Sequence, residues 1–207
     1  MALSTYAELK TAIQTWLGRP GDTTLALADF IALCEARVSR DLRVRAMEER
    51  VTATVSTQYV ALPPGFLEMR NFQLNTNPVT SLSLMSPEQI DSINAGSESG
   101  RPRVYAIIGN EIQLAPTPDA EYEAEMTYWK RITPLSDDEP TNWLLENAPD
   151  VYLFGALAES APFLGEDGRY ALWDAKYKEG ISRLQRADDR GKWSGSVMQV
   201  RTDIGNP

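Results

Sequence analysis

The amino-acid sequence predicts an α+β fold: a helical bundle formed by N- and C-terminal helices, with an inserted antiparallel β domain and an extended C-terminal tail. Three observations support this prediction. Apolar residues recur at helical spacing near both ends of the chain, alternate with a period of two in the middle, and enter a glycine-containing segment after residue 189. The predicted parts are 1–48 and 141–189 for the bundle, 49–140 for the β domain and 190–207 for the tail.

Two helices are predicted in residues 1–48. Thr5 precedes Glu8 by three residues, a spacing typical of a capping box, and Gly18 and Pro20 end the first helix. The apolar positions of this helix are Leu9, Ile13, Trp16 and Leu17. The second helix has one apolar face, which consists of Leu27, Phe30, Ile31, Cys34, Val38 and Leu42.

Three arginines, Arg37, Arg40 and Arg43, lie elsewhere around the second helix. They form either a solvated surface or a surface that faces another subunit. Such charged helix faces are most often solvated.

The middle of the chain has strand-like patterns. Val51, Ala53 and Val55 alternate before a Pro-Pro turn, and Ser86 begins a short predicted helix with Gln89 three residues later. Gly109-Asn110 is typical of a tight hairpin turn between two β-branched runs. The segment EYEAEMTYWKRI is predicted to be a strand next to that hairpin, because its apolar residues alternate with glutamates.

Helical periodicity resumes after the acidic segment TPLSDDEPTNW. Thr141 is a candidate cap for WLLEN, PDVYLFGALAESAPFLG follows as a second helical segment, and the last helix is the longest. Its apolar face consists of Trp173, Tyr177, Ile181 and Leu184. The tryptophans inside predicted elements are expected in the core; they are Trp16, Trp129, Trp143 and Trp173.

Composition restricts the function. The 207 residues carry a net charge of −9 at a pI near 4.6, which argues against a general phosphate-binding surface. The chain has no histidine and a single cysteine, Cys34, so no thiolate metal site and no internal disulfide can form. No leader-like start and no membrane-spanning run is apparent, so we expect synthesis in the cytoplasm and no membrane association. No Gly-rich phosphate loop and no dinucleotide fingerprint is apparent either, so we expect no cofactor.

Carboxylates are the remaining candidates for chemistry. Two acidic segments stand out, and their residues are Asp137, Asp138 and Glu139 in one and Glu121, Glu123 and Glu125 in the other. Solvated surfaces explain both segments. The alternative is a hydrolase whose two catalytic carboxylates lie about 5 to 10 Å apart.

The end of the chain carries apolar residues that a short tail has little means to bury. They are Trp193, Val197, Met198 and Val200. An extended segment of this kind adds to a partner's sheet or fills its pockets. The alternatives are a tail that folds back onto its own bundle and a frayed end.

The combined pattern resembles the head-to-tail adaptor proteins of tailed bacteriophages, in particular the tail tubular A type of short-tailed phages. The similar stretches are TYAELKTAIQTWLGRP, ADFIALCEARVSRDLRVR, the LPPGF turn and the segment from NWLLENAPDV to RGKWSGS. The resemblance covers nearly the whole chain. It implies a structural, non-enzymatic virion protein at the head–tail interface, assembled in the host cytoplasm.

The resemblance also implies partners. Twelve copies would form a ring beneath the portal, contact a tail or nozzle protein, and let double-stranded DNA pass during ejection without specific binding. It assigns portal contacts to Trp193, Val197, Met198, Val200, Arg190, Lys192 and Arg201. Arg37, Arg40 and Arg43 are then candidates for the subunit interface. A tail-completion or stopper protein at the next position in the stack remains an alternative.

Overall fold

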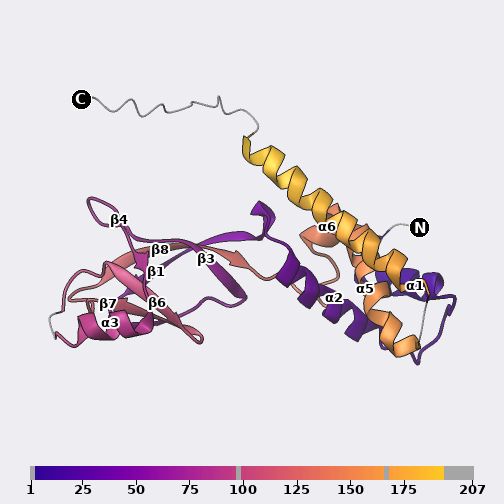
Figure 1. The fold of residues 1–207 in the computed structure, drawn as a ribbon, viewed down its shortest axis with the longest axis horizontal. Coiled ribbons are helices and arrows are strands. Elements are labelled where there is room, and N and C mark those ends of the chain that lie inside the picture. The colour runs from indigo at the N-terminus through magenta and orange to yellow at the C-terminus, as the bar shows by residue number, and fades with distance from the viewer. Residues whose placement is uncertain (1–2, 97–98, 166–167, 194–207) are drawn as a thin grey trace. The chain divides into compact units, whose positions relative to one another are not determined.

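The computed structural model describes residues 3–96, 99–165 and 168–193. They form two compact units, a helical unit up to Val44 and from Pro134 onward, and a β unit of Arg45–Thr133 (Figure 1). The predicted α+β class is confirmed. Residues 134–140 were placed in the β domain by the sequence, but in the structure they contact the helical unit, where Tyr6 N donates to Pro140 O at 2.8 Å.

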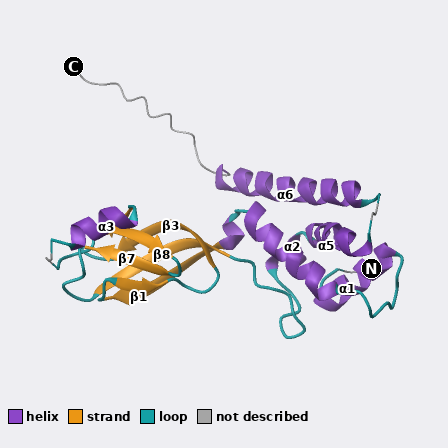
Figure 2. Ribbon diagram, turned by 60° about the horizontal axis from the view of Figure 1, so that its bottom comes forward, coloured by secondary structure: helices purple, strands orange, loops and turns teal. Residues whose placement is uncertain are grey.

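The central element of the helical unit is α5. The helices of this unit are α1 (Tyr6–Leu17), α2 (Leu27–Asp41), α4 (Trp143–Asn147), α5 (Pro149–Leu164) and α6 (Tyr170–Trp193). Helix α5 packs against each of the other four, and Figure 2 shows it beside α2 and α6. Its apolar residues therefore extend around most of its circumference, as expected of a helix with neighbours on several sides.

Two glycines allow close packing of these helices. A Cβ atom at Gly155 of α5 would collide with Cys34 Sγ of α2 and lie 3.1 Å from Cδ2 of Tyr177 in α6. A Cβ atom at Gly180 of α6 would lie 2.7 Å from Cγ2 of Val151 in α5. Because packed carbon atoms prefer separations of about 3.5 to 4 Å, both glycines set the spacing between helices.

The predicted capping box of α1 is confirmed. Thr5 Oγ1 accepts from Glu8 N at 3.3 Å, and Glu8 Oε2 accepts from Thr5 N at 3.2 Å. The cap of α4, however, is Asn142 and not Thr141, because the Asn142 Oδ1 atom accepts from Leu145 N at 2.9 Å.

The predicted burial of the tryptophans holds for two of the four. Trp129 and Trp173 are buried, whereas Trp143 is partly exposed. The prediction for Trp16 is wrong, because this side chain is 51% exposed. It lies in the last turn of α1, where edge-on packing against Phe154 leaves about half of the indole uncovered.

Helix α6 is longer than predicted. It continues through Trp193, so Arg190, Gly191 and Lys192 belong to the helix and not to an extended tail. A glycine inside a helix costs about 1 kcal/mol relative to alanine. The ion pair between Lys192 and Asp188, at 3.0 Å, spans Gly191 and offsets part of this cost.

The β unit contains two sheets. Its strands are β1 (Glu48–Val55), β2 (Tyr59–Ala61), β3 (Phe66–Leu74), β4 (Thr80–Ser81), β5 (Ser83–Leu84), β6 (Val104–Ile108), β7 (Glu111–Ala115) and β8 (Tyr122–Lys130). One sheet has the order β1-β8-β3-β4 and the other β2-β7-β6-β5. The β5–β6 pair is parallel, so the predicted purely antiparallel domain is instead mixed. The remaining elements are the 3₁₀ turn η1 (Arg45–Met47) and α3 (Pro87–Asn94), where Gln89 completes the predicted cap by accepting from Ser86 N.

The predicted hairpin at Gly109-Asn110 is confirmed, since β6 and β7 pair antiparallel and Gly109 has a φ of 59°. The predicted strand EYEAEMTYWKRI exists as β8, but its expected position beside the hairpin is wrong. It pairs with β1 and β3 in the other sheet. The physical reason is that Ala124, Met126 and Tyr128 point into the core shared by both sheets. A strand in either sheet could bury the same three side chains in that core.

Candidate functional site

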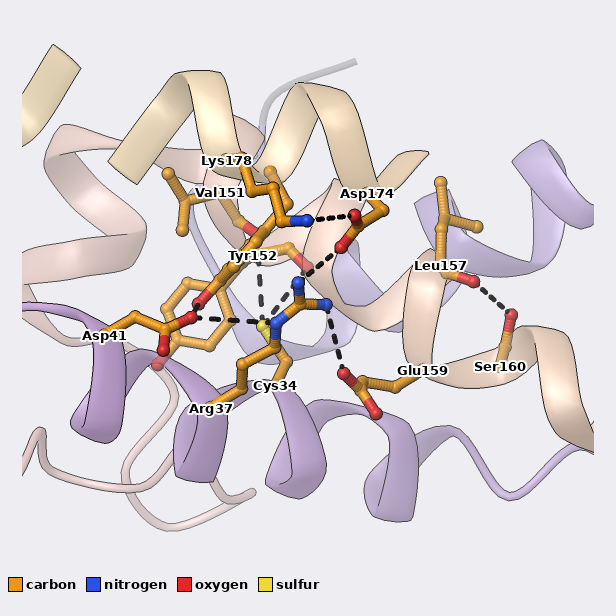
Figure 3. A network of polar contacts seen from close by, with 11 residues as sticks. Cys34, Arg37, Asp41, Val151, Tyr152, Leu157, Glu159, Ser160, Asp174 and Lys178 are labelled. Carbon is orange, nitrogen blue, oxygen red and sulfur yellow. Dashed lines mark hydrogen bonds and ion pairs between the residues drawn. The ribbon is translucent and has the colours of Figure 1, made fainter. Parts of the chain in front are cut away.

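Arg37 connects three helices of the helical unit. Its guanidinium donates to Asp174 of α6 and, at 3.3 Å, to Glu159 of α5 (Figure 3). It also lies 4.1 Å from the ring centroid of Tyr177, whose hydroxyl donates to Asp41 of α2 at 3.1 Å. The Arg37 side chain is 17% exposed, so its charge is used largely within the subunit.

The pKa of the Asp174 carboxyl group is lowered by this arrangement. Hydrogen bonds from Arg37 and then from Lys178 hold the pKa of Asp174 below its usual value. Lys178 reaches Asp174 Oδ2 at 2.8 Å. The cluster therefore keeps Asp174 ionised and joins α2, α5 and α6 near neutral pH.

The other two arginines of α2 have different surroundings. Arg43 donates to the main-chain oxygens of Ser39 and Leu42, both at 2.7 Å. Arg40 is exposed and makes no hydrogen bond or ion pair with any described residue. Of the three arginines expected at a subunit interface, Arg40 is the one whose charge remains available to a partner.

A second polar cluster lies on another side of α2. Glu35 Oε1 accepts from Leu135 N at 2.7 Å and from the Tyr152 hydroxyl at 3.0 Å, and Asn142 donates to that hydroxyl at 2.6 Å. Burial raises the pKa of Glu35. The cluster fixes the chain around residues 135–142 against α2 and α5.

The two acidic segments belong to different units. Asp137, Asp138 and Glu139 are exposed on the helical unit, whereas Glu121 and Glu123 are exposed in the β unit. Asp137 pairs with Lys10 at 3.0 Å. Glu125 pairs with Arg50 at 3.5 Å. Within the described ranges, no group of three or more acidic or cysteine side chains is placed to hold a metal ion.

The residues predicted to contact a portal fall at and beyond the end of α6. Arg190 and Lys192 lie in its last turn, and Lys192 pairs with Asp188 and Asp189 at 3.0 and 3.2 Å. The backbone of Trp193 ends this helix. Val197, Met198, Val200 and Arg201 lie outside the described residues.

Two surface features were missed by the sequence-based reasoning. An apolar cavity of about 230 Å³ in the β unit is lined mainly by β1 and β2, including Val51, Val55 and Val60. A shallow depression on α6 is lined by Arg183, Arg186, Asp189 and Arg190. The spacing of the arginines is visible in the sequence, but the absence of an ion pair between Arg186 or Arg190 and any described residue is not.

Comparison with known proteins gives the family. A model of the SU10 adaptor protein family matches residues 4–201, which is nearly the entire chain. A search of curated proteins found no match. No helix in the described part of the chain has the length and apolarity needed to cross a membrane. The chain belongs to the SU10 adaptor protein family, a family of phage head–tail adaptors.

Proposed function

We propose that this protein forms a ring of twelve copies directly beneath the portal of a tailed phage, in the position of the tail tubular A type adaptors that its sequence resembles. The ring joins the portal to a tail or nozzle protein and surrounds the path of double-stranded DNA. The chain reaches this place from the host cytoplasm and acts as a structural part, without catalysis. The stopper position next in the stack is the competing assignment.

The observation that carries this proposal is the extent of the family match. It runs from the first helix through α6 and on to residue 201. The segment after α6 is therefore within the part that family members share, together with both folded units. This supports a function in which Val197, Met198 and Val200 take part together with both folded units.

In this proposal the end of α6 and the residues after it contact the portal. Arg190 and Lys192 supply positive charge in the last turn, where cations also interact favourably with the helix dipole. Trp193, Val197, Met198 and Val200 supply apolar anchors, and Arg201 adds another cation. Short segments that bind in this way lose part of their binding free energy to ordering.

Subunit contacts are proposed to use Arg40, since its charge has no described partner. Arg37 and Arg43 then support that surface from within the subunit through the contacts described above. The acidic balance of the chain, with a net charge of −9, favours a conduit that DNA passes without binding.

Light scattering on the purified protein, alone and mixed with the portal protein of the same phage, tests the proposal. The informative truncation ends after Trp193, because a shorter one would remove part of α6. A full-length variant with Val197, Met198 and Val200 replaced by serine keeps the chain length and removes the anchors. We expect the full chain to join the portal in a large complex and both variants to bind it at least tenfold more weakly.

Circular dichroism provides the folding control, because both variants retain every helix of the described structure. Unchanged portal binding by both variants would refute the assignment of the C-terminal anchors. Absence of portal binding by the full chain, combined with binding to the tail-side protein, would favour the stopper position.

A further inference from the structure

One face of α6 carries a row of arginines. Arg183, Arg186 and Arg190 are separated by three and four residues, a spacing that places side chains on the same side of a helix. All three are exposed, and together with Asp189 they line one shallow depression. We call Arg183, Arg186 and Arg190 the basic face.

Most of the charge on this face is not neutralised by the residues that the structure describes. Arg183 pairs with Glu179 at 2.5 Å. Arg186 and Arg190 make no ion pair with any residue that the structure describes, and Asp189, the nearby acid, pairs with Lys192. In a chain with a net charge of −9, two adjacent unneutralised guanidinium groups form a local field of opposite sign.

The same unit presents an exposed acidic turn, formed by Asp137, Asp138 and Glu139. Its shape is fixed internally, because Ser136 N donates to Glu139 O at 3.0 Å and Glu139 N donates to Ser136 Oγ at 2.9 Å. Asp137 pairs with Lys10. Asp138 and Glu139 make no ion pair with the part of the chain that the structure describes.

The basic face and the acidic turn lie on different sides of the helical unit. Helix α2 contacts α6 through Arg37 and Asp41, whereas it contacts the chain next to the acidic turn through Glu35. At 100° per residue, Arg37 and Asp41 lie about 200° and 240° around α2 from Glu35. Figure 2 shows α6 along one side of α2, and the bond to Leu135 holds the acidic turn to the opposite side.

We propose that the basic face of one subunit docks on the acidic turn of the next copy in the ring. Two complementary surfaces on opposite sides of one subunit are what a head-to-tail ring requires, because each copy must present both halves of the contact. Opposite charges across the contact favour the correct partner and penalise contacts between like faces. This inference rests on the proposed ring and names a subunit contact in addition to the one proposed for Arg40.

Charge reversal tests the contact. One variant carries Arg183→Glu and Arg186→Glu, a second carries Asp138→Lys and Glu139→Lys, and a third carries all four changes. Arg190 is left unchanged because the proposed portal contact also uses it. The matched control is Arg19→Glu, a change of the same sign at a half-exposed loop residue of the same unit.

Light scattering, with and without the cognate portal protein, measures the assembled fraction. Each two-residue variant is expected to lower that fraction about tenfold or more, because like charges then face each other. The four-residue variant is expected to assemble again. An equimolar mixture of the two defective variants is also expected to assemble, because each one then offers the charge that its neighbour lacks.

Several outcomes would overturn the inference. Unchanged assembly of the reversed variants would do so, as would failure of both the mixture and the four-residue variant to restore it. If the arginine variant assembles normally but loses retention of a double-stranded DNA fragment at low salt, the basic face binds nucleic acid instead. If the charge-reversed variants bind portal and assemble like the wild type, this contact alone is refuted and the proposed function stands. If the wild-type chain neither assembles nor binds portal, both are refuted.

Discussion

Replacement of Arg37 by methionine removes a charge that holds three helices together while it keeps a long apolar side chain. Arg37 and Asp174 have side-chain exposures of 17% and 15%, so both charges are largely shielded from water. Removal of one partner from a fully buried pair costs about 3 to 5 kcal/mol. Partial exposure of the other partners, Glu159 and Asp41, reduces that figure. We expect a loss of about 2 kcal/mol in unfolding free energy.

The assay is urea unfolding followed by the helical circular dichroism signal, with Arg40→Met as the matched control. Arg40 has no described partner, so its replacement is expected to change stability by less than about 0.5 kcal/mol. Because the pKa of Asp174 is lowered in the folded state, its contribution is present above its unfolded pKa and is lost as the pH falls through the folded one. The difference between wild type and Arg37→Met should therefore shrink below about pH 4. Equal unfolding free energies of Arg37→Met and Arg40→Met at pH 7 would refute this account.

Two further predictions concern the interior of the helical unit. Gly155→Ala should lower the unfolding free energy by about 1 to 3 kcal/mol, despite the better helix propensity of alanine, because the new methyl group meets Cys34 and Tyr177. The control is Gly168→Ala, because Gly168 has open space around it. A Gly155→Ala variant that is more stable than the wild type in thermal unfolding would contradict the packing argument. Glu35→Gln keeps an oxygen acceptor for Leu135 N and Tyr152. Because burial raises the pKa of Glu35 in the folded state, wild-type stability should fall as the pH rises through that pKa, and the glutamine variant should lack this fall in urea titrations at several pH values.

Local features of the fold were predictable from neighbouring residues. The cap at Thr5 and the turn at Gly109-Asn110 depend on backbone conformations that a few adjacent residues impose. The end of α6 was not predictable in this way. Gly191 signals a helix end by propensity, but the side-chain pair between Asp188 and Lys192 spans it and the helix continues.

Strand pairing depended on the tertiary structure. Alternation in β8 indicated correctly that Ala124, Met126 and Tyr128 share a buried face. It did not identify the neighbouring strands, because an apolar face is buried equally well in either of two packed sheets. The position of β8 between β1 and β3 is decided by contacts between residues far apart in the sequence.

The sequence by itself determined the class of the fold, the approximate positions of its helices and strands, and the resemblance to phage adaptors that the family match supports. Only the tertiary structure distinguished Arg37 from Arg40, and showed that Arg186 lacks an acidic partner in the described part of the chain. The physical reason is that helix and strand periodicity reflects interactions over a few residues. Whether a charge is neutralised within the subunit or remains available to a partner depends instead on which distant side chains the fold brings within about 4 Å of it.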